Sequence, residues 1–111
     1  MAAILLVRIK SALDAQEFER RLVERRPRFR EVPGLVQKIY GRDDATGDVC
    51  GMYFFESKEE LAAFRETELA RTIPAAYEAV DLRREVYDVL YPLWPERGPF
   101  TDFDRVADAP R

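Results

Sequence analysis

The chain has 111 residues, which is enough for one domain with a modest core. Charged residues make up 35% of it and the net charge is -3, which argues against a nucleic-acid-binding protein because phosphate backbones select basic surfaces. Histidine is absent and Cys50 is the single cysteine, which excludes an internal disulfide, a His-dependent nucleophile and the usual ligand sets of zinc, copper and haem iron. We therefore expect no metal and no cofactor, although a carboxylate-only Mg²⁺ site stays open.

The first apolar segment predicts a strand over residues 3–10, because it is short and contains several β-branched residues. One face of this strand carries Leu5. The other carries Ile4 and Leu6, followed by Arg8, so both faces present apolar residues. The run Ala2–Val7 is much shorter than the roughly 20 residues of a membrane-spanning helix, and it lacks the charged front and cleavage site of a signal peptide. We expect a cytoplasmic protein with no membrane partner.

The first helix is predicted to begin after Asp14, because Glu17 follows three residues later in the spacing of a capping box. Phe18 and Leu22 lie near one stripe of this helix. Pro27 lies inside the helical pattern and removes a backbone donor, so we expect a kink or a break there.

A β-hairpin is predicted next, with strands over residues 35–42 and 49–56. The turn between them contains Asp43 and Gly47, residue types that favour tight turns. The second of these strands is rich in aromatic residues, which suits a strand with a packed face.

A second capping box, formed by Ser57 and Glu60, predicts the start of another helix. Pro74 interrupts this helix, and a short helical piece is expected to run to about Val80. The last strand is predicted over residues 82–91.

The predicted order is β-α-β-β-α-β, a ferredoxin-like α+β fold with a four-stranded antiparallel sheet and both helices on one face. The uncovered face of such a sheet is normally polar. Here the first strand is apolar on both faces, and the third strand places Met52 and Phe54 opposite Tyr53 and Phe55. A second copy related by a two-fold axis is the simplest cover for the second apolar face, so we predict a homodimer.

Residues 1–93 are predicted to form this domain. Residues 94–111 form a tail that contains Trp94, Phe100 and Phe103. These aromatic residues are unusual for a linker, so we expect the tail to pack on the domain or on its partner.

Three segments resemble a known family: Val-Pro-Gly-Leu-Val-Gln-Lys-Ile-Tyr at 32–40, Cys-Gly-Met-Tyr-Phe-Phe at 50–55 and Val-Tyr-Asp-Val at 86–89. They are similar to monooxygenases of the dimeric α/β-barrel superfamily, which includes the cofactor-independent antibiotic-biosynthesis monooxygenases. The resemblance covers most of residues 3–93. It implies a homodimer with two sheets packed face to face, and in each protomer a pocket between sheet and helices for a small apolar or aromatic ligand.

The resemblance implies a monooxygenase that acts on a small aromatic or polyketide-like molecule without a cofactor. In such a reaction the substrate supplies the electrons, so the protein must provide a base, donors for a developing oxyanion and a dry aromatic pocket. The candidate catalytic residues are Tyr53 and Asp88. The candidate substrate-binding residues are Arg8, Lys38, Tyr40, Phe64 and Tyr87.

Each candidate also has a structural interpretation. Arg8 and Lys38 can pair with carboxylates at the rim of a dimer, the tyrosines can be half-buried core residues, and Asp88 can protect a sheet edge. The family often has tryptophan where Gln37 and Tyr40 stand. Such differences favour an alternative function, a non-catalytic dimer that binds a small molecule, and a third hypothesis is a dimer with a collapsed pocket.

Overall fold

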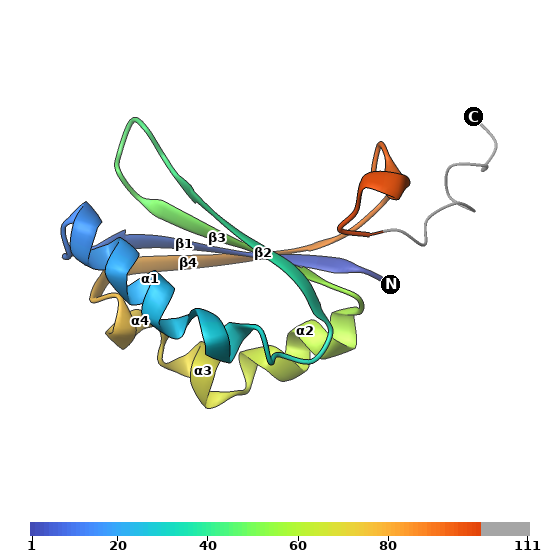
Figure 1. The fold of residues 1–111 in the computed structure, drawn as a ribbon, viewed down its shortest axis with the longest axis horizontal. Coiled ribbons are helices and arrows are strands. Elements are labelled where there is room, and N and C mark those ends of the chain that lie inside the picture. The colour runs from blue at the N-terminus through green and yellow to red at the C-terminus, as the bar shows by residue number, and fades with distance from the viewer. Residues whose placement is uncertain (101–111) are drawn as a thin grey trace.

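The structure is a computed structural model that describes residues 1–100 of the chain. It has two layers: an antiparallel sheet with strand order β2-β3-β1-β4, and helices gathered on one face of that sheet (Figure 1). The elements are β1 (Ala3–Ser11), α1 (Ala15–Phe29), β2 (Leu35–Arg42), β3 (Val49–Phe55), α2 (Lys58–Arg65), α3 (Glu68–Arg71), α4 (Ile73–Ala76), β4 (Ala79–Asp88) and η1 (Pro95–Arg97). This architecture confirms the predicted ferredoxin-like α+β fold.

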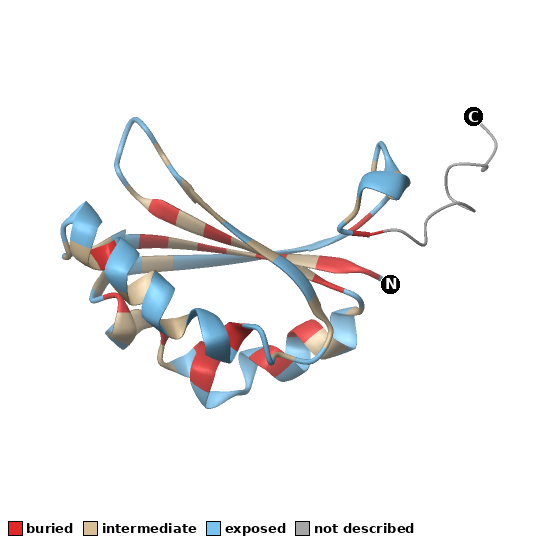
Figure 2. Ribbon diagram, in the orientation of Figure 1, coloured by how far each residue is buried: buried red, intermediate tan, exposed pale blue. Residues whose placement is uncertain are grey.

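The register of β1 sets the two faces of the sheet. Leu5 stands opposite Tyr53 of β3, and both side chains are buried on the side that carries the helices. The adjacent pair, Ile4 and Phe54, points to the other face, which we call the outer face, because side chains alternate along a strand. Buried residues accordingly recur at every second position along β1 and β3 (Figure 2).

Aromatic rings fill the space between the sheet and the helices. Phe64 of α2 packs against Tyr53 and Phe55 of β3, with ring centres 5.4 and 5.6 Å apart, and against Phe29 of α1 at 6.2 Å. Such tilted aromatic pairs add stability beyond the area that they bury. Within residues 1–100, no helix is long and apolar enough to cross a membrane.

Helix α1 begins where the capping box predicts, since the Asp14 side chain accepts a hydrogen bond of 2.8 Å from the backbone nitrogen of Glu17. The predicted break at Pro27 is wrong, because α1 continues through it to Phe29. Pro27 leaves the carbonyl of Val23 without its helical donor. Val23 is 55% exposed, so water can satisfy that carbonyl and the helix can tolerate the proline.

The chain between α2 and β4 differs from the prediction at its end. Ser57 caps α2 as expected, but the last short helix, α4, ends at Ala76 and β4 already begins at Ala79. Glu78 has a left-handed backbone with φ 45°, a reversal that stops the helix and starts the strand. The predicted strand over residues 82–91 is therefore shifted toward the C-terminus relative to β4.

The tail beyond β4 contacts the outer face of the sheet at Phe100. Phe100 packs on Phe54 with ring centres 5.7 Å apart, in a small apolar cluster with Ala2 and Val89. Residues 101–111 of the predicted tail, including Phe103, lie outside the described residues.

Candidate functional site

A cavity of about 710 Å³ lies between helix α1 and strand β2. This volume falls within the range of about 300–1,000 Å³ that is typical of small-molecule sites. The walls combine apolar and basic side chains: Glu19, Leu22, Val23, Arg26, Phe29, Arg30, Leu35, Gln37, Lys38 and Tyr40.

Lys38 is the most unusual residue of this cavity. Its Nζ atom is buried and has no hydrogen-bond partner in the described part of the chain. The atom lies 3.0 Å from the ring centre of Phe29, 4.4 Å from that of Tyr53 and 4.5 Å from that of Tyr40. A lysine amine that is enclosed by three rings and lacks a carboxylate partner is uncommon in a protein interior.

The surroundings of Lys38 favour its uncharged form. Burial, assisted by the positive charge of Arg25, lowers the pKa of the Lys38 amine to about 6. The ring faces act in the opposite direction, because they attract a cation, and they therefore support the ammonium once it forms. Lys38 is thus a free base at neutral pH whose protonated form is still accommodated.

Two tyrosines, Tyr40 and Tyr53, lie beside this amine, and a third, Tyr77, is within electrostatic reach of both. Burial is the main cause that raises the pKa of Tyr40, Tyr53 and Tyr77. The pKa of each of these hydroxyls is also affected by at least one of the other two. The Tyr77 hydroxyl is buried and has no hydrogen-bond partner among residues 1–100. These groups are therefore hydrogen-bond donors rather than bases at neutral pH.

Arg25 connects the cluster to the neighbouring helices. Its Nη2 atom donates to the carbonyl oxygen of Leu69 at 2.9 Å and to Oγ1 of Thr72 at 3.1 Å. Its guanidinium lies 5.8 Å from the ring centre of Phe29 and 5.6 Å from that of Tyr77. The arginine is therefore held in place where its charge adds to the effect of burial in favouring the uncharged Lys38 amine.

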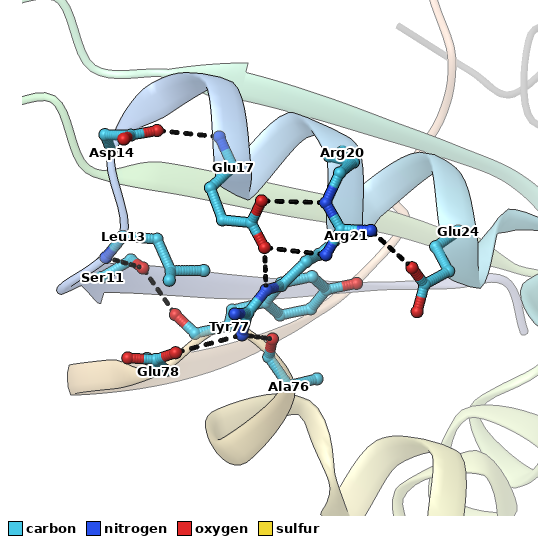
Figure 3. A network of polar contacts seen from close by, with 10 residues as sticks. All are labelled: Ser11, Leu13, Asp14, Glu17, Arg20, Arg21, Glu24, Ala76, Tyr77 and Glu78. Atoms are coloured by element: carbon cyan, nitrogen blue, oxygen red, sulfur yellow. Dashed lines mark hydrogen bonds and ion pairs between the residues drawn. The ribbon is translucent and has the colours of Figure 1, made fainter.

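A network of polar contacts fixes the position of Tyr77 (Figure 3). Arg21 of α1 is paired with Glu17 at 2.7 Å and donates to the carbonyl of Ala76 at 3.1 Å. Tyr77 itself stacks on Phe18, with ring centres 4.9 Å apart. The first two turns of α1 thus hold the chain just before β4, and with it the Tyr77 hydroxyl.

Strand geometry explains how the remaining groups meet. Lys38 and Tyr40 are two residues apart on β2 and share a face, and Lys38 stands directly opposite Tyr53 of β3. Gly51 stands opposite Tyr40. A Cβ atom at Gly51 would come within 3.1 Å of the Tyr53 ring and 3.2 Å of the Tyr40 ring, so the absence of a side chain makes room for both.

The structure brings together four of the residues proposed from the sequence. Lys38 and Tyr40 line the cavity, Tyr53 lies behind them, and Phe64 packs beneath Tyr53. Arg25, Phe29 and Tyr77 belong to the same cluster, but sequence reasoning missed them as site residues. The spacing of Arg25 and Phe29, four apart on one helix, would have placed them on one face.

The other three proposed residues lie away from this cavity. Arg8 is on the outer face, where its Nη2 atom is 2.8 Å from Asp43 and 3.1 Å from Asp48. Tyr87 is on the same face and donates to Glu85. Asp88 lies at the end of the edge strand β4, 3.2 Å from Lys58.

Residues 4–94 match the family described as "Putative mono-oxygenase ydhR". The chain belongs to this family. The match includes every residue of the cluster around Lys38, because these lie between residues 25 and 77. Among curated proteins, no sequence matches the chain.

Several solved structures have the same fold as the chain. SnoaB, a cofactor-independent oxygenase from Streptomyces nogalater, is 13% identical with a TM-score of 0.69, covering 83% of this chain and 96% of its own. An antibiotic-biosynthesis monooxygenase homologue from Caulobacter crescentus CB15 is 17% identical with a TM-score of 0.67, covering 81% and 91%. A dimeric ferredoxin-like protein of unknown function from Jannaschia sp. CCS1 is 13% identical with a TM-score of 0.63, covering 80% and 100%. At these identities the likeness shows the shared fold.

Proposed function

We propose that this member of the ydhR family is a cofactor-independent monooxygenase that oxidises a small, acidic aromatic or polyketide-like molecule in the cavity between α1 and β2. The observation that carries the proposal is the uncharged Lys38 amine, unpaired and enclosed by aromatic rings at the wall of that cavity. The family assignment and the fold shared with SnoaB add support from a second direction.

The reaction begins with proton transfer from the substrate to Nζ of Lys38. A substrate with an acidic CH₂ group between aromatic rings, such as an anthrone, becomes an electron-rich anion that can reduce O₂ directly. In the overall reaction R₂CH₂ + O₂ → R₂C=O + H₂O, one oxygen atom forms the new carbonyl and the other leaves as water. The substrate loses four electrons and O₂ gains them, so no other reductant is needed.

The neighbouring side chains have distinct roles in this scheme. The protonated hydroxyl of Tyr40, at the wall of the cavity, donates a hydrogen bond to the oxyanion that develops on the substrate, and the protonated hydroxyl of Tyr53 supports it as a second donor from behind. The new ammonium on Lys38 rests against the rings of Phe29, Tyr40 and Tyr53. We thus assign Tyr53 as a donor rather than the base, and we leave Asp88 outside the reaction because it is paired with Lys58 at the sheet edge.

The proposal can be tested by oxygen uptake with dithranol, a simple acidic anthrone, with the spontaneous rate without protein subtracted. The wild-type protein, treated with a chelator and free of flavin, should consume O₂ and form the corresponding anthraquinone. Lys38→Met keeps the length of the side chain and removes the base, so the rate should fall by about 100-fold or more. Lys58→Met is the matched control, because Lys58 pairs with Asp88 away from the cavity.

The outcomes separate the two candidate functions. Unchanged oxygen uptake in the Lys38→Met variant would remove Lys38 from the mechanism. Binding of dithranol by the wild-type protein without any oxygen uptake would instead support the alternative, a non-catalytic protein that binds a small molecule.

We also propose that the protein is a homodimer joined through the outer face of the sheet. Leu6 of β1, Met52 of β3 and Ile39 of β2 lie in one row across this face, and Ile39 is 46% exposed. A dimeric protein with the same fold supports this arrangement. Ile39→Lys should shift the mass measured by light scattering from dimer to monomer, whereas Val80→Lys, at an exposed apolar position on the edge strand β4, should leave it unchanged.

A further inference from the structure

The rim of the cavity carries positive charge that the proposed reaction does not use. Arg26 and Arg30 both line the cavity, and they are four residues apart, on the same side of α1 and just beyond it. Both residues are exposed, and neither side chain makes an ion pair or hydrogen bond with another described residue. Two adjacent guanidinium groups are therefore available to a ligand.

Two arginines in the first half of α1, unlike the two at the rim, are paired with carboxylates. Arg20 is paired with Glu17 and Glu24, each at 2.8 Å, and Arg21 is paired with Glu17 at 2.7 Å. The acidic residue of the cavity wall, Glu19, stands seven positions before Arg26, which is about 10 Å along a helix axis. The basic end of the cavity thus has no carboxylate of its own, although the chain as a whole has a net charge of -3.

The rest of the wall complements this basic end. Leu22, Phe29 and Leu35 offer apolar surface between the rim and the amine of Lys38. Gln37 uses its side-chain oxygen to accept a hydrogen bond of 2.9 Å from the backbone nitrogen of Lys38, which leaves its amide NH₂ as a further donor at the wall. The cavity therefore combines an apolar body with donors and positive charge at one end.

We propose that the cavity selects an aromatic anion: a flat apolar ring system that carries a carboxylate or a similar acidic group held by Arg26 and Arg30. The planar guanidinium groups suit the paired oxygens of such a group. Fixing the anionic end at the rim directs the opposite end of the ring system toward Lys38. This inference rests on the proposed function in one respect, namely that the bound anion is the substrate. The binding of the anion does not depend on whether it is oxidised.

Two fluorescent dyes with the same anilinonaphthalene body test the proposal. 1-Anilinonaphthalene-8-sulfonate carries a negative charge and N-phenyl-1-naphthylamine carries none. The wild-type protein should bind the sulfonate with a lower Kd than the neutral dye, and added salt should weaken the binding of the sulfonate alone. Val23→Trp, which narrows the cavity, should weaken the binding of both dyes.

The decisive comparison uses variants of the rim. Replacing both Arg26 and Arg30 by Gln should raise the Kd of the sulfonate by about tenfold, because two charge-assisted contacts are lost, while the Kd of the neutral dye stays the same. Arg28→Gln is the matched control for Arg26→Gln alone, since each removes one positive charge from α1 and only Arg26 lines the cavity.

Three results would overturn the proposal. They are equal affinity of the wild-type protein for the two dyes, an equal effect of Arg26→Gln and Arg28→Gln, and insensitivity of both dyes to Val23→Trp. The measurement is of binding, so it is separate from the test of the reaction. Charge-selective binding without oxygen uptake would reject the monooxygenase and keep the anion site. Oxygen uptake without charge-selective binding would reject the anion site and keep the monooxygenase.

Discussion

Lys38 and Arg8 are both basic residues on strands, and they lie on opposite faces of one sheet. Arg8 is half-buried and has carboxylate partners, and its hydrogen bond with Asp43 is the main cause that raises its pKa. Lys38 has a buried amine without a partner, and burial lowers its pKa to about 6. Arg8 stabilises the loop that carries Asp43, whereas Lys38 is available for proton transfer. The contrast shows that the chemistry of a cation depends on its surroundings more than on its residue type.

The largest expected effect is on the rate of oxygen uptake, and it is measured by substituting one tyrosine on each face of the sheet. Tyr53→Phe removes a hydroxyl donor beside Lys38, so the rate of oxygen uptake with dithranol should fall by about 100-fold. Tyr87→Phe removes a hydroxyl that donates to Glu85 on the outer face, and its rate should stay within about twofold of wild type. Equal rates for the two variants would remove Tyr53 from the site.

The pH dependence of the rate sharpens the same contrast. In the proposed reaction the free amine of Lys38 is the base, and its pKa is about 6. The rate should therefore be level above this pH and fall by about tenfold for each unit below it. Initial rates between pH 5 and 8, corrected for the spontaneous reaction, check this. A rate that rises as the pH falls would mean that the ammonium is the active form.

Stability should depend on pH through the same residue. The pKa of Lys38 falls from 10.5 to about 6 on folding, so between these values the unfolded chain binds one more proton than the folded one. The folded state therefore gains stability relative to the unfolded state as the pH rises from 6 toward 10.5. The Lys38→Met variant lacks this contribution. Urea unfolding at pH 7 and pH 9 should show wild type gaining free energy of unfolding relative to Lys38→Met, and a constant difference would contradict the shift.

Glycine substitutions give the smallest expected effect. A Cβ atom at Gly51 meets the rings of Tyr53 and Tyr40, which are packed in the core cluster, whereas a Cβ atom at Gly41 meets the flexible end of Met52 at 3.2 Å. Gly51→Ala should lower the free energy of unfolding by about 1–3 kcal/mol, and Gly41→Ala should lower it less. Thermal unfolding of the two variants provides the comparison.

Local signals in the sequence were sufficient to predict most of the fold. The two capping boxes marked the starts of α1 and α2, and the turn residues between 42 and 49 placed the hairpin. The start of β4 was missed because it depends on a left-handed residue, Glu78, a conformation that glutamate rarely adopts. A reversal of this kind has no signature in residue type.

The site was only partly predictable for a related reason. Alternation along the strands correctly separated Arg8 from the residues that share a face with Leu5, but both faces of β1 are apolar, so the sequence did not show which face the helices cover. Arg25 and Tyr77 join the site through contacts between elements distant in the chain. Such contacts require the tertiary structure.

The position of the cavity at the edge strand β2 has a consequence for how this family can diversify. Val23 and Gln37 line the cavity and are exposed, so they can change at little cost to folding. Phe29 and Tyr53, which enclose the reactive amine, belong to the buried core and are constrained by it. Evolution can therefore alter which molecule enters the cavity while it preserves the Lys38 amine and the rings that enclose it.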